Sequence, residues 1–170
     1  MRHALQSILL LVPSLNAQAQ LQPGKKAPAW SLPDASDVRH ASSQFANNFL
    51  LIIGGDKKSQ DSNNDWGNRV RKAFPAGLPS VAMADASAVP RLLRGVYRNQ
   101  FREEASHMGV PYLLDWDGSV THNLGFKAGV SNVILIGGHN SVVFVITGPA
   151  KDEDVKKLCG IAAEKLRDAH

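Results

Sequence analysis

The amino-acid sequence predicts a single α/β domain in which a central mixed β-sheet carries helices on both faces. The run FLLII at residues 49–53 is followed by Gly54 and Gly55, as expected of a strand covered on both faces. Helical patterns and short apolar runs then alternate as far as residue 124. Near the C-terminus, VILI and VVFVIT flank GGHNS, which predicts two antiparallel strands joined by five residues. Strands that alternate with helices, followed by a C-terminal hairpin, indicate a mixed sheet.

The first residues predict a secretory signal peptide. Arg2 and His3 precede the apolar segment 4–15, and Ala17-Gln18-Ala19 is a small-x-small sequence of the kind that signal peptidase cleaves. An uncleaved anchor or a short buried helix is the alternative, but the apolar run is shorter than the roughly 20 residues that span a bilayer. We therefore expect cleavage near Ala19, a domain formed by residues 20–170, and a periplasmic or secreted protein without a transmembrane segment.

Composition excludes several classes of protein. Hydrophobic residues make up 44% of the chain and charged residues 20%, which is typical of a globular domain. A net charge of +4 is too small to indicate binding to nucleic acid. Cys159 is the only cysteine, so no disulfide can form within the chain in an oxidising compartment.

The N-terminal half of the domain contains a short extended piece at residues 29–32, a turn at Pro33-Asp34, and a helical turn that starts at Ser42 and Ser43. After the strand 49–53 and a polar loop, four apolar residues recur at helical spacing. They are Trp66, Val70, Ala73 and Phe74. This periodicity predicts an amphipathic helix that ends at Pro75.

The segment PSVAMA, residues 79–84, predicts a second strand, and Ser87 with Pro90 marks the start of a second helix. We expect one face of this helix to be buried. That face consists of Leu93, Val96, Tyr97 and Phe101.

A third strand is predicted at residues 110–114, followed by a turn at 115–118 and a short helix at 120–124. Asp152 is expected to cap the last helix. The apolar face of that helix comprises Val155, Leu158, Cys159, Ala162 and Leu166.

With these elements in place, three passages resemble the redoxin group of the thioredoxin superfamily, the alkyl hydroperoxide reductase and thiol-specific antioxidant proteins and their thioredoxin-like relatives. GKKAPAWSLPD resembles the opening G-x-x-A-P-x-F-x-L-x-D, with Trp30 in the aromatic position. VPYLLDWDGSVTHNLGF resembles L-x-D-x-D-G-x-x-x-x-x-x-G, and NVILIGGHNSVVFVITGP resembles the closing hairpin x-F-L-I-D-x-x-G-x-I-x-x-x-x-x-G. The resemblance covers nearly all of residues 20–170 and implies a thioredoxin-like fold.

The chain departs from this group at the active site. The resemblance implies a reactive cysteine in the loop after the first buried strand, where the chain reads Gly55, Asp56, Lys57, Lys58 and Ser59. No thiol lies between Gly54 and Trp66, so neither a peroxidatic cysteine nor a Cys-x-x-Cys pair can operate. The resemblance also implies a cis-proline before the strand at 133–136, where Ser131 and Asn132 stand instead.

Other residues of the sequence are candidate sites. Ser59 could act as a nucleophile only with an activating base, and no such arrangement is visible, so we expect a solvated serine that caps the next helix. GGDKKS could hold an anion through backbone amides, although it lacks the spacing of a nucleotide-binding loop. Histidine and carboxylate spacings indicate no metal site, and no cofactor is expected.

Four arginines form a stripe along the second helix, at spacings of three, four and four residues. They are Arg91, Arg94, Arg98 and Arg102. This stripe is either a solvated face or a surface for an anionic ligand or a partner.

Two functional hypotheses follow. The first is an exported, non-catalytic redoxin-like protein that binds a protein partner or an anionic ligand through the former active-site face or the arginine stripe. The second is an antioxidant or thiol oxidoreductase that acts through Cys159 or through unrecognised residues. The helical spacing favours a buried, inert Cys159, and the sequence leaves the oligomeric state open.

Overall fold

The computed structural model describes residues 21–75 and 77–168, and the expected signal peptide lies outside them. Its main sheet has five strands in the order β5-β4-β3-β6-β7. Their bounds are β3 (Leu50–Gly55), β4 (Ser80–Asp85), β5 (Tyr112–Asp115), β6 (Asn132–Gly137) and β7 (Ser141–Thr147). Strands β3, β4 and β5 run parallel, whereas β6 is antiparallel to both β3 and β7. The predicted mixed sheet is therefore confirmed.

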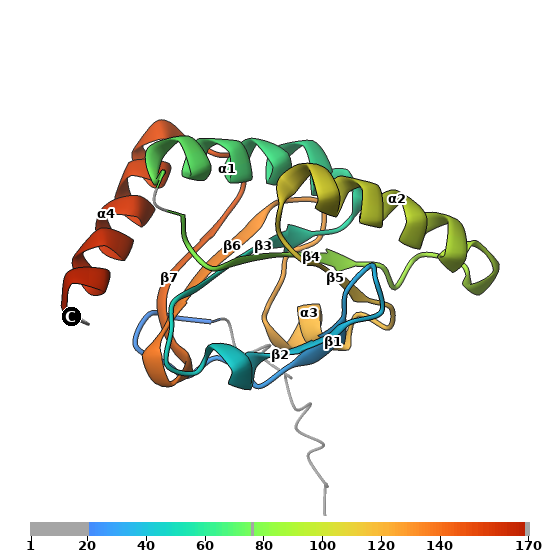
Figure 1. The fold of residues 1–170 in the computed structure, drawn as a ribbon, viewed down its shortest axis with the longest axis horizontal. Coiled ribbons are helices and arrows are strands. Elements are labelled where there is room, and N and C mark those ends of the chain that lie inside the picture. The colour runs from blue at the N-terminus through green and yellow to red at the C-terminus, as the bar shows by residue number, and fades with distance from the viewer. Residues whose placement is uncertain (1–20, 76, 169–170) are drawn as a thin grey trace, which may run out of the picture.

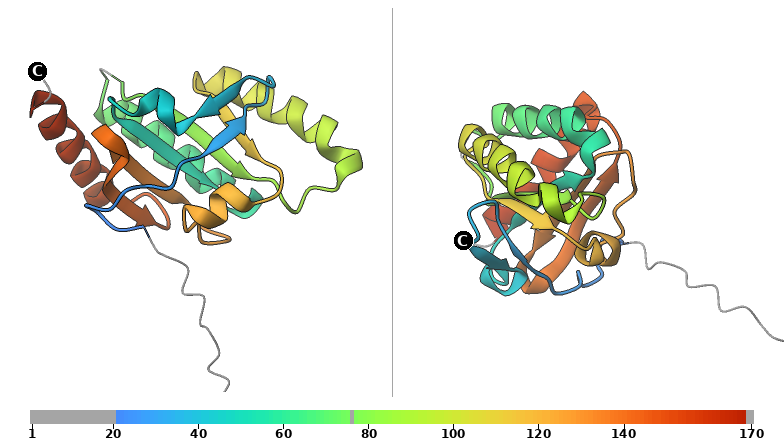
Figure 2. Two further views of the ribbon diagram at one scale, coloured as in Figure 1. Left: turned by 90° about the horizontal axis from the view of Figure 1, so that it is seen from below. Right: turned by 90° about the vertical axis from the view of Figure 1, so that its right-hand side faces the viewer.

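Helices cover both faces of this sheet (Figure 1). They are α1 (Gln60–Ala73), α2 (Arg94–Met108), α3 (Ser119–Asn123) and α4 (Asp152–Asp168). Helices α1 and α4 pack on one face with α2 beside α1. The other face is covered by α3 and by the hairpin of β1 (Ser31–Pro33) and β2 (Arg39–Ala41) (Figures 1 and 2). The chain thus forms one domain with a layer on each side of the sheet.

Alternate residues of the central strand β3 enter opposite cores. Leu50 and Ile52 face the layer that contains α3 and the N-terminal hairpin, while Leu51 and Ile53 face α1 and α4. In the second core the ring of Trp66 is fully buried, and its indole nitrogen donates to the carbonyl oxygen of Gly148 at 2.9 Å. Side-chain alternation along a strand with both faces covered explains why the sequence shows a continuous apolar run.

Strand β3 continues through Gly54 and Gly55 instead of ending at Ile53 as the sequence suggested. A Cβ atom on Gly54 would lie 2.1 Å from the carbonyl oxygen of Met83, and one on Gly55 would lie 2.2 Å from the Ser59 hydroxyl. Both distances are far below van der Waals contact. The two glycines therefore let the neighbouring strand and the next turn approach the end of β3 closely.

The prediction for the second helix was partly wrong. Leu93 and Val96 were expected in the core, but they are 45% and 66% exposed. The start of α2 projects beyond the edge of the sheet, so no strand lies beneath it (Figure 2). Farther along α2, Phe101 packs against Tyr112 of β5 with ring centroids 4.9 Å apart.

Smaller differences concern helix ends and one connection. Asp152 is the first residue of α4, not its cap, and its carboxylate accepts a hydrogen bond from Arg69 at 2.5 Å. Ala73 is exposed at the end of α1. Strands β6 and β7 are longer than expected, so three residues join them instead of five.

Replacing Gly54 with alanine tests the close approach at the end of β3. We expect Gly54→Ala to lower the free energy of unfolding by about 3 kcal/mol, because the added methyl group meets backbone that cannot move without separating two strands. Gly67→Ala is the matched control. A Cβ at Gly67 meets nothing within 4 Å, so we expect this substitution to stabilise α1 by about 0.5–1 kcal/mol. Urea denaturation measures the free energy of unfolding of both variants. Equal changes in the two would contradict the close packing at Gly54.

Candidate functional site

The loop in which the redoxin resemblance implies a reactive cysteine joins β3 to α1. It runs from Gly55 through Asp56 into a 3₁₀ turn, Lys57–Ser59, that continues directly as the helix. Beside it lies a cavity of about 270 Å³ whose other walls are the end of β4 and the first half of α2. The residues around it are Gly55, Asp56, Lys57, Lys58, Gln60, Ala84, Asp85, Ala86, Ala88, Val89, Pro90, Tyr97, Gln100, Phe101 and Tyr112. We call this space the loop cavity.

The carboxylate of Asp56 occupies the backbone amides that an anion would need. One oxygen accepts from the amide of Lys58 at 2.9 Å, and the other accepts from the amide of Gly129 at 2.7 Å. The second bond joins this loop to the segment before β6, 73 residues away in the chain. The carboxylate of Asp56 therefore occupies the amide groups at the helix start, so these amides are not available to an external phosphate.

Ser59 holds the N-cap position of α1, as predicted, but it is buried and not solvated, and its side chain forms no capping hydrogen bond. Only 1% of it is exposed, and its hydroxyl donates to the carbonyl oxygen of Asp56 at 2.8 Å. The hydroxyl also accepts from the side-chain amide of Asn63 at 3.2 Å. Both partners are neutral amide groups, so neither can remove the hydroxyl proton and activate an attack.

Ser131 and Asn132 complete the site on the side opposite α2. The Ser131 hydroxyl donates to that of Ser62 in α1 at 2.7 Å, and both Ser131 and Asn132 are buried. The side chain of Asn132 accepts from the amide of Lys127 at 2.8 Å and donates to the carbonyl oxygen of Val130 at 3.0 Å. Residues 21–75 and 77–168 contain no cis peptide bond. Side-chain hydrogen bonds thus fix the segment in which the redoxin resemblance implies a cis-proline.

The structure brings three of the four stripe arginines against the protein and leaves Arg91 exposed. Arg94 donates to the carbonyl oxygen of Trp116 at 2.9 Å, and its guanidinium lies 5.1 Å from the centre of that indole ring. Arg98 forms an ion pair with Asp37 at 3.0 Å. Arg102 donates to the carbonyl oxygen of Ala35 at 2.9 Å. These contacts hold α2 to the turns at residues 34–37 and 115–118.

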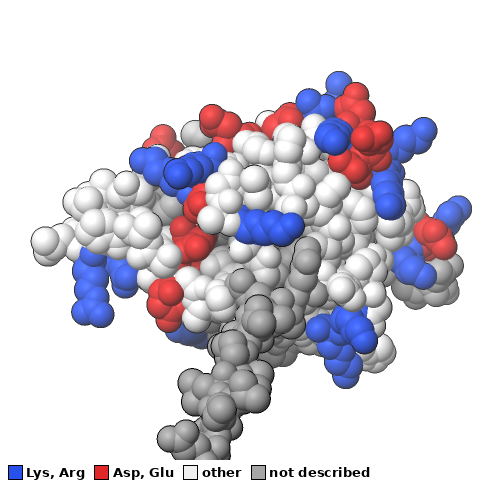
Figure 3. Space-filling view, turned by 180° about the vertical axis from the view of Figure 1, so that it is seen from behind, with Lys and Arg blue, Asp and Glu red and all other residues white. Residues whose placement is uncertain are grey.

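Because Arg94 and Arg98 face the protein, apolar side chains at the start of α2 face solvent. Leu92 is 96% exposed and adjoins the exposed Leu93 and Val96. Figure 3 shows the end of the molecule formed by the start of α2, at the left, as a mainly uncharged surface with basic groups nearby. We call these three residues the apolar tip. Sequence periodicity did not predict the apolar tip, because the spacing of Leu93 and Val96 also fits the buried face of a helix.

Cys159 lies in α4, away from the loop. It is 8% exposed and belongs to the core between α1, α4 and the sheet, with Leu158 and Ala162. Burial raises the pKa of its thiol above the ordinary value of 9.0. A neutral, enclosed thiol is a poor nucleophile, so the expectation of a core cysteine is confirmed.

No helix formed by residues 21–75 and 77–168 is both long enough and apolar enough to cross a membrane. No cluster of three or more His, Cys, Asp or Glu side chains in this part of the chain is arranged to hold a metal ion.

The bridge formed by Asp56 predicts a specific loss of stability. We expect Asp56→Ala to lower the free energy of unfolding by about 1–2 kcal/mol, because two amide groups lose their acceptor. Hydrogen exchange at the Gly129 amide should become faster in the same variant. Asp61→Ala removes an equal charge from the first turn of α1 and should cost less than about 1 kcal/mol. If Gly129 exchanges at the wild-type rate in Asp56→Ala, the bridge does not hold the two segments together.

The buried thiol predicts a pH dependence of stability. Since the pKa of Cys159 is higher in the folded protein than in the unfolded chain, its contribution is complete below the ordinary value of 9.0 and is lost as the pH rises through the folded pKa. The free energy of unfolding should therefore decrease above pH 9.0 more steeply in the wild type than in Cys159→Ala. Denaturation curves at a series of pH values measure this slope, and parallel slopes would show that the thiol is not buried.

The comparisons with known proteins agree on the fold. No family model matches the sequence, and no curated protein matches it. Solved structures do match. A hypothetical protein from Sinorhizobium meliloti has a TM-score of 0.65 and 20% identity over 88% of this chain and 86% of its own.

Two further matches have named activities or locations. The thioredoxin domain of a thiol-disulfide oxidoreductase from Bacteroides vulgatus has a TM-score of 0.60 and 11% identity, covering 84% of this chain and 99% of its own. The exposed lipoprotein thioredoxin Etrx1 from Streptococcus pneumoniae has a TM-score of 0.61 and 10% identity, covering 78% of this chain and 98% of its own. At these identities the likeness concerns the fold, and the protein described here therefore has the thioredoxin-like fold that its redoxin motifs predict.

Proposed function

We propose that this protein is an exported, non-catalytic thioredoxin-fold protein that binds a partner protein through the face formed by the loop cavity and the apolar tip. One observation carries the proposal. The helix start that holds the reactive thiol in redoxins contains an engaged carboxylate, Asp56, and beside it open apolar side chains adjoin a cavity.

The apolar tip favours a protein partner. Single exposed apolar residues are common on soluble proteins and need no explanation. Here Leu92, Leu93 and Val96 lie within five positions of one another at one helix start, and they lie beside the loop cavity, to which Pro90 and Tyr97 contribute. Covering a leucine or valine side chain contributes about 1.5–3 kcal/mol. A partner that covers the tip and inserts a side chain into the cavity would gain from both.

Charges around this face indicate the chemistry of the partner. Arg91, Lys57 and Lys58 are exposed, and none of them forms an ion pair with any residue of the described ranges. Lys57 lies 5.7 Å from the ring centre of Tyr97, at the edge of the cavity. We therefore propose a partner segment in which apolar side chains are flanked by carboxylates.

Catalysis through Cys159 is the less favoured alternative. The thiol is buried in the core of α1, α4 and the sheet, and its pKa is raised, which are both unfavourable for reaction with peroxide or a disulfide. The former active-site loop lacks a thiol altogether. Export is supported by the signal-like pattern of residues 1–19.

Site-specific photocrosslinking tests the proposed face. A benzoylphenylalanine placed at Leu92, in the cells that produce the protein, should form a discrete crosslinked product with one partner. The same group at the exposed His107, at the other end of α2, is the matched control and should not form it. Adding Val96→Asp to the Leu92 probe should reduce the yield by about tenfold, because a buried carboxylate opposes binding.

Two results would contradict the proposal. Equal products from both positions would indicate non-specific contact. No product at Leu92 would show that the apolar tip is not covered.

A further inference from the structure

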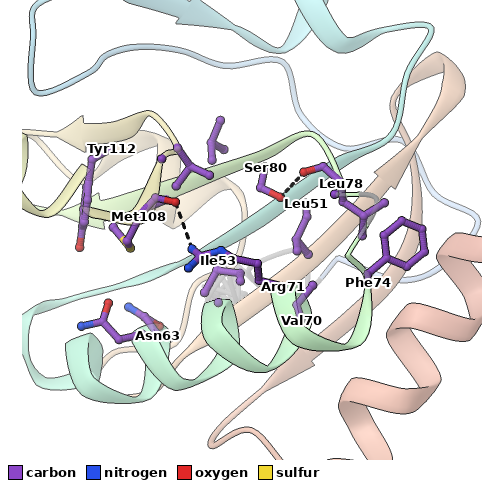
Figure 4. Close-up of a pocket in the computed structure, with 17 residues that line it drawn as sticks. Leu51, Ile53, Asn63, Val70, Arg71, Phe74, Leu78, Ser80, Met108 and Tyr112 are labelled. Carbon is purple, nitrogen blue, oxygen red and sulfur yellow. Dashed lines mark hydrogen bonds between the residues drawn. The ribbon is translucent and has the colours of Figure 1, made fainter. Parts of the chain in front are cut away.

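A second cavity of about 270 Å³ lies between α1 and the C-terminal end of α2, over strands β3 and β4 (Figure 4). It differs from the loop cavity, although the ring of Tyr112 touches both. Between the two, Gln60 of α1 donates a hydrogen bond to Glu104 of α2. We call the second space the interhelical cavity. It is separate from the face proposed to bind a partner.

The body of the interhelical cavity is apolar. Ile53 and Leu51 of β3 form part of its floor, and Val70, Phe74 and Leu78 form its side toward the end of α1 (Figure 4). Such a lining suits the hydrocarbon part of a small molecule, because each apolar group transferred from water stabilises binding.

One cation is placed to receive an acidic group. Arg71 is the only charged residue among those that line this cavity. Its guanidinium reaches across to donate to the carbonyl oxygen of Met108 at 3.0 Å, and it forms no ion pair with any residue in the ranges 21–75 and 77–168. Most of its five N–H groups remain available. A guanidinium fixed by one bond to a helix end is well oriented to bind a carboxylate through the others.

A hydrogen-bond acceptor lies at another part of the lining. The side-chain oxygen of Asn63 is buried and has no hydrogen-bond partner, whereas the amide nitrogen of the same side chain donates to Ser59. Asn63 and Tyr112 lie at one end of the cavity (Figure 4). A buried acceptor without a partner destabilises the protein by about 1–3 kcal/mol unless a donor reaches it. A hydroxyl group on a ligand would supply that donor.

We infer that the interhelical cavity binds a small carboxylic acid with an apolar body and a hydroxyl group at its far end. The carboxylate pairs with Arg71, the hydrocarbon lies over Ile53 and Val70, and the hydroxyl donates to Asn63. Asn63 and Arg71 are eight positions apart on α1, which corresponds to about 12 Å along the helix axis. A chain of medium length is therefore needed to reach both.

Three probe molecules separate these contributions. 8-Hydroxyoctanoate carries all three features, 1,8-octanediol lacks the carboxylate, and octanoate lacks the terminal hydroxyl. Binding to the purified protein is measured by calorimetry, and the site is located from the methyl NMR shifts of Val70, Leu78 and Met108. We expect 8-hydroxyoctanoate to bind about tenfold more tightly than either analogue, since each lacks one polar contact.

Substitutions provide the matched tests. Arg71→Gln should weaken the binding of 8-hydroxyoctanoate about tenfold and leave the affinity for 1,8-octanediol unchanged. Lys72→Gln removes the adjacent exposed cation, which does not line the cavity. This substitution should change the affinity for neither compound. Gly67 lines the cavity and has open space at its Cβ position, so Gly67→Leu should fill the cavity and abolish binding in a folded protein.

The outcomes are distinct. Binding that requires Arg71 and an open Gly67 position supports the inference. Absence of binding, or binding that Gly67→Leu leaves intact, overturns it. Equal affinities for octanoate and 8-hydroxyoctanoate overturn the role given to Asn63. None of these results depends on the photocrosslinking of Leu92, so the two proposals succeed or fail separately.

Discussion

The structure depends on strand β3 being enclosed on every side. It pairs with β4 on one edge and with β6 on the other, and its two faces enter separate cores. At its end, the carbonyl oxygen of Met83 and the hydroxyl of Ser59 approach Gly54 and Gly55 so closely that neither glycine could carry a side chain. This packing fixes where the chain leaves the sheet, and thereby where the loop and α1 begin.

The loop that follows is the one in which the redoxin resemblance implies a reactive cysteine, and it satisfies its polar groups internally. Asp56 accepts two amide hydrogens, Ser59 is buried against Asn63, and Ser131 bonds to Ser62. A thiolate or a bound anion would need the same amides. The loop thus satisfies its polar groups without a ligand, and we propose that a partner is recognised at the loop cavity and the apolar tip.

Much of the fold could be predicted from the sequence because its patterns are local. Apolar runs identify β3 and β6, and the motifs that carry the redoxin resemblance contain structural residues: Trp30 is in the core, and the buried Asp115 accepts from the amides of Gly118 and Thr121. The site was harder to predict. Arg94 and Arg98 turn toward Trp116, and Val96 turns to solvent, because α2 overhangs the sheet edge. That depends on where the helix docks, which periodicity alone does not specify.

The central claim is that this protein works without thiol chemistry. Its most direct test is the rate at which the purified protein consumes hydrogen peroxide in the presence of a thiol reductant, compared with Cys159→Ser. The account predicts that both proteins consume peroxide no faster than buffer with reductant, since the only thiol is buried. Consumption by the wild type that disappears in Cys159→Ser would contradict the account and make the protein a one-cysteine peroxidase.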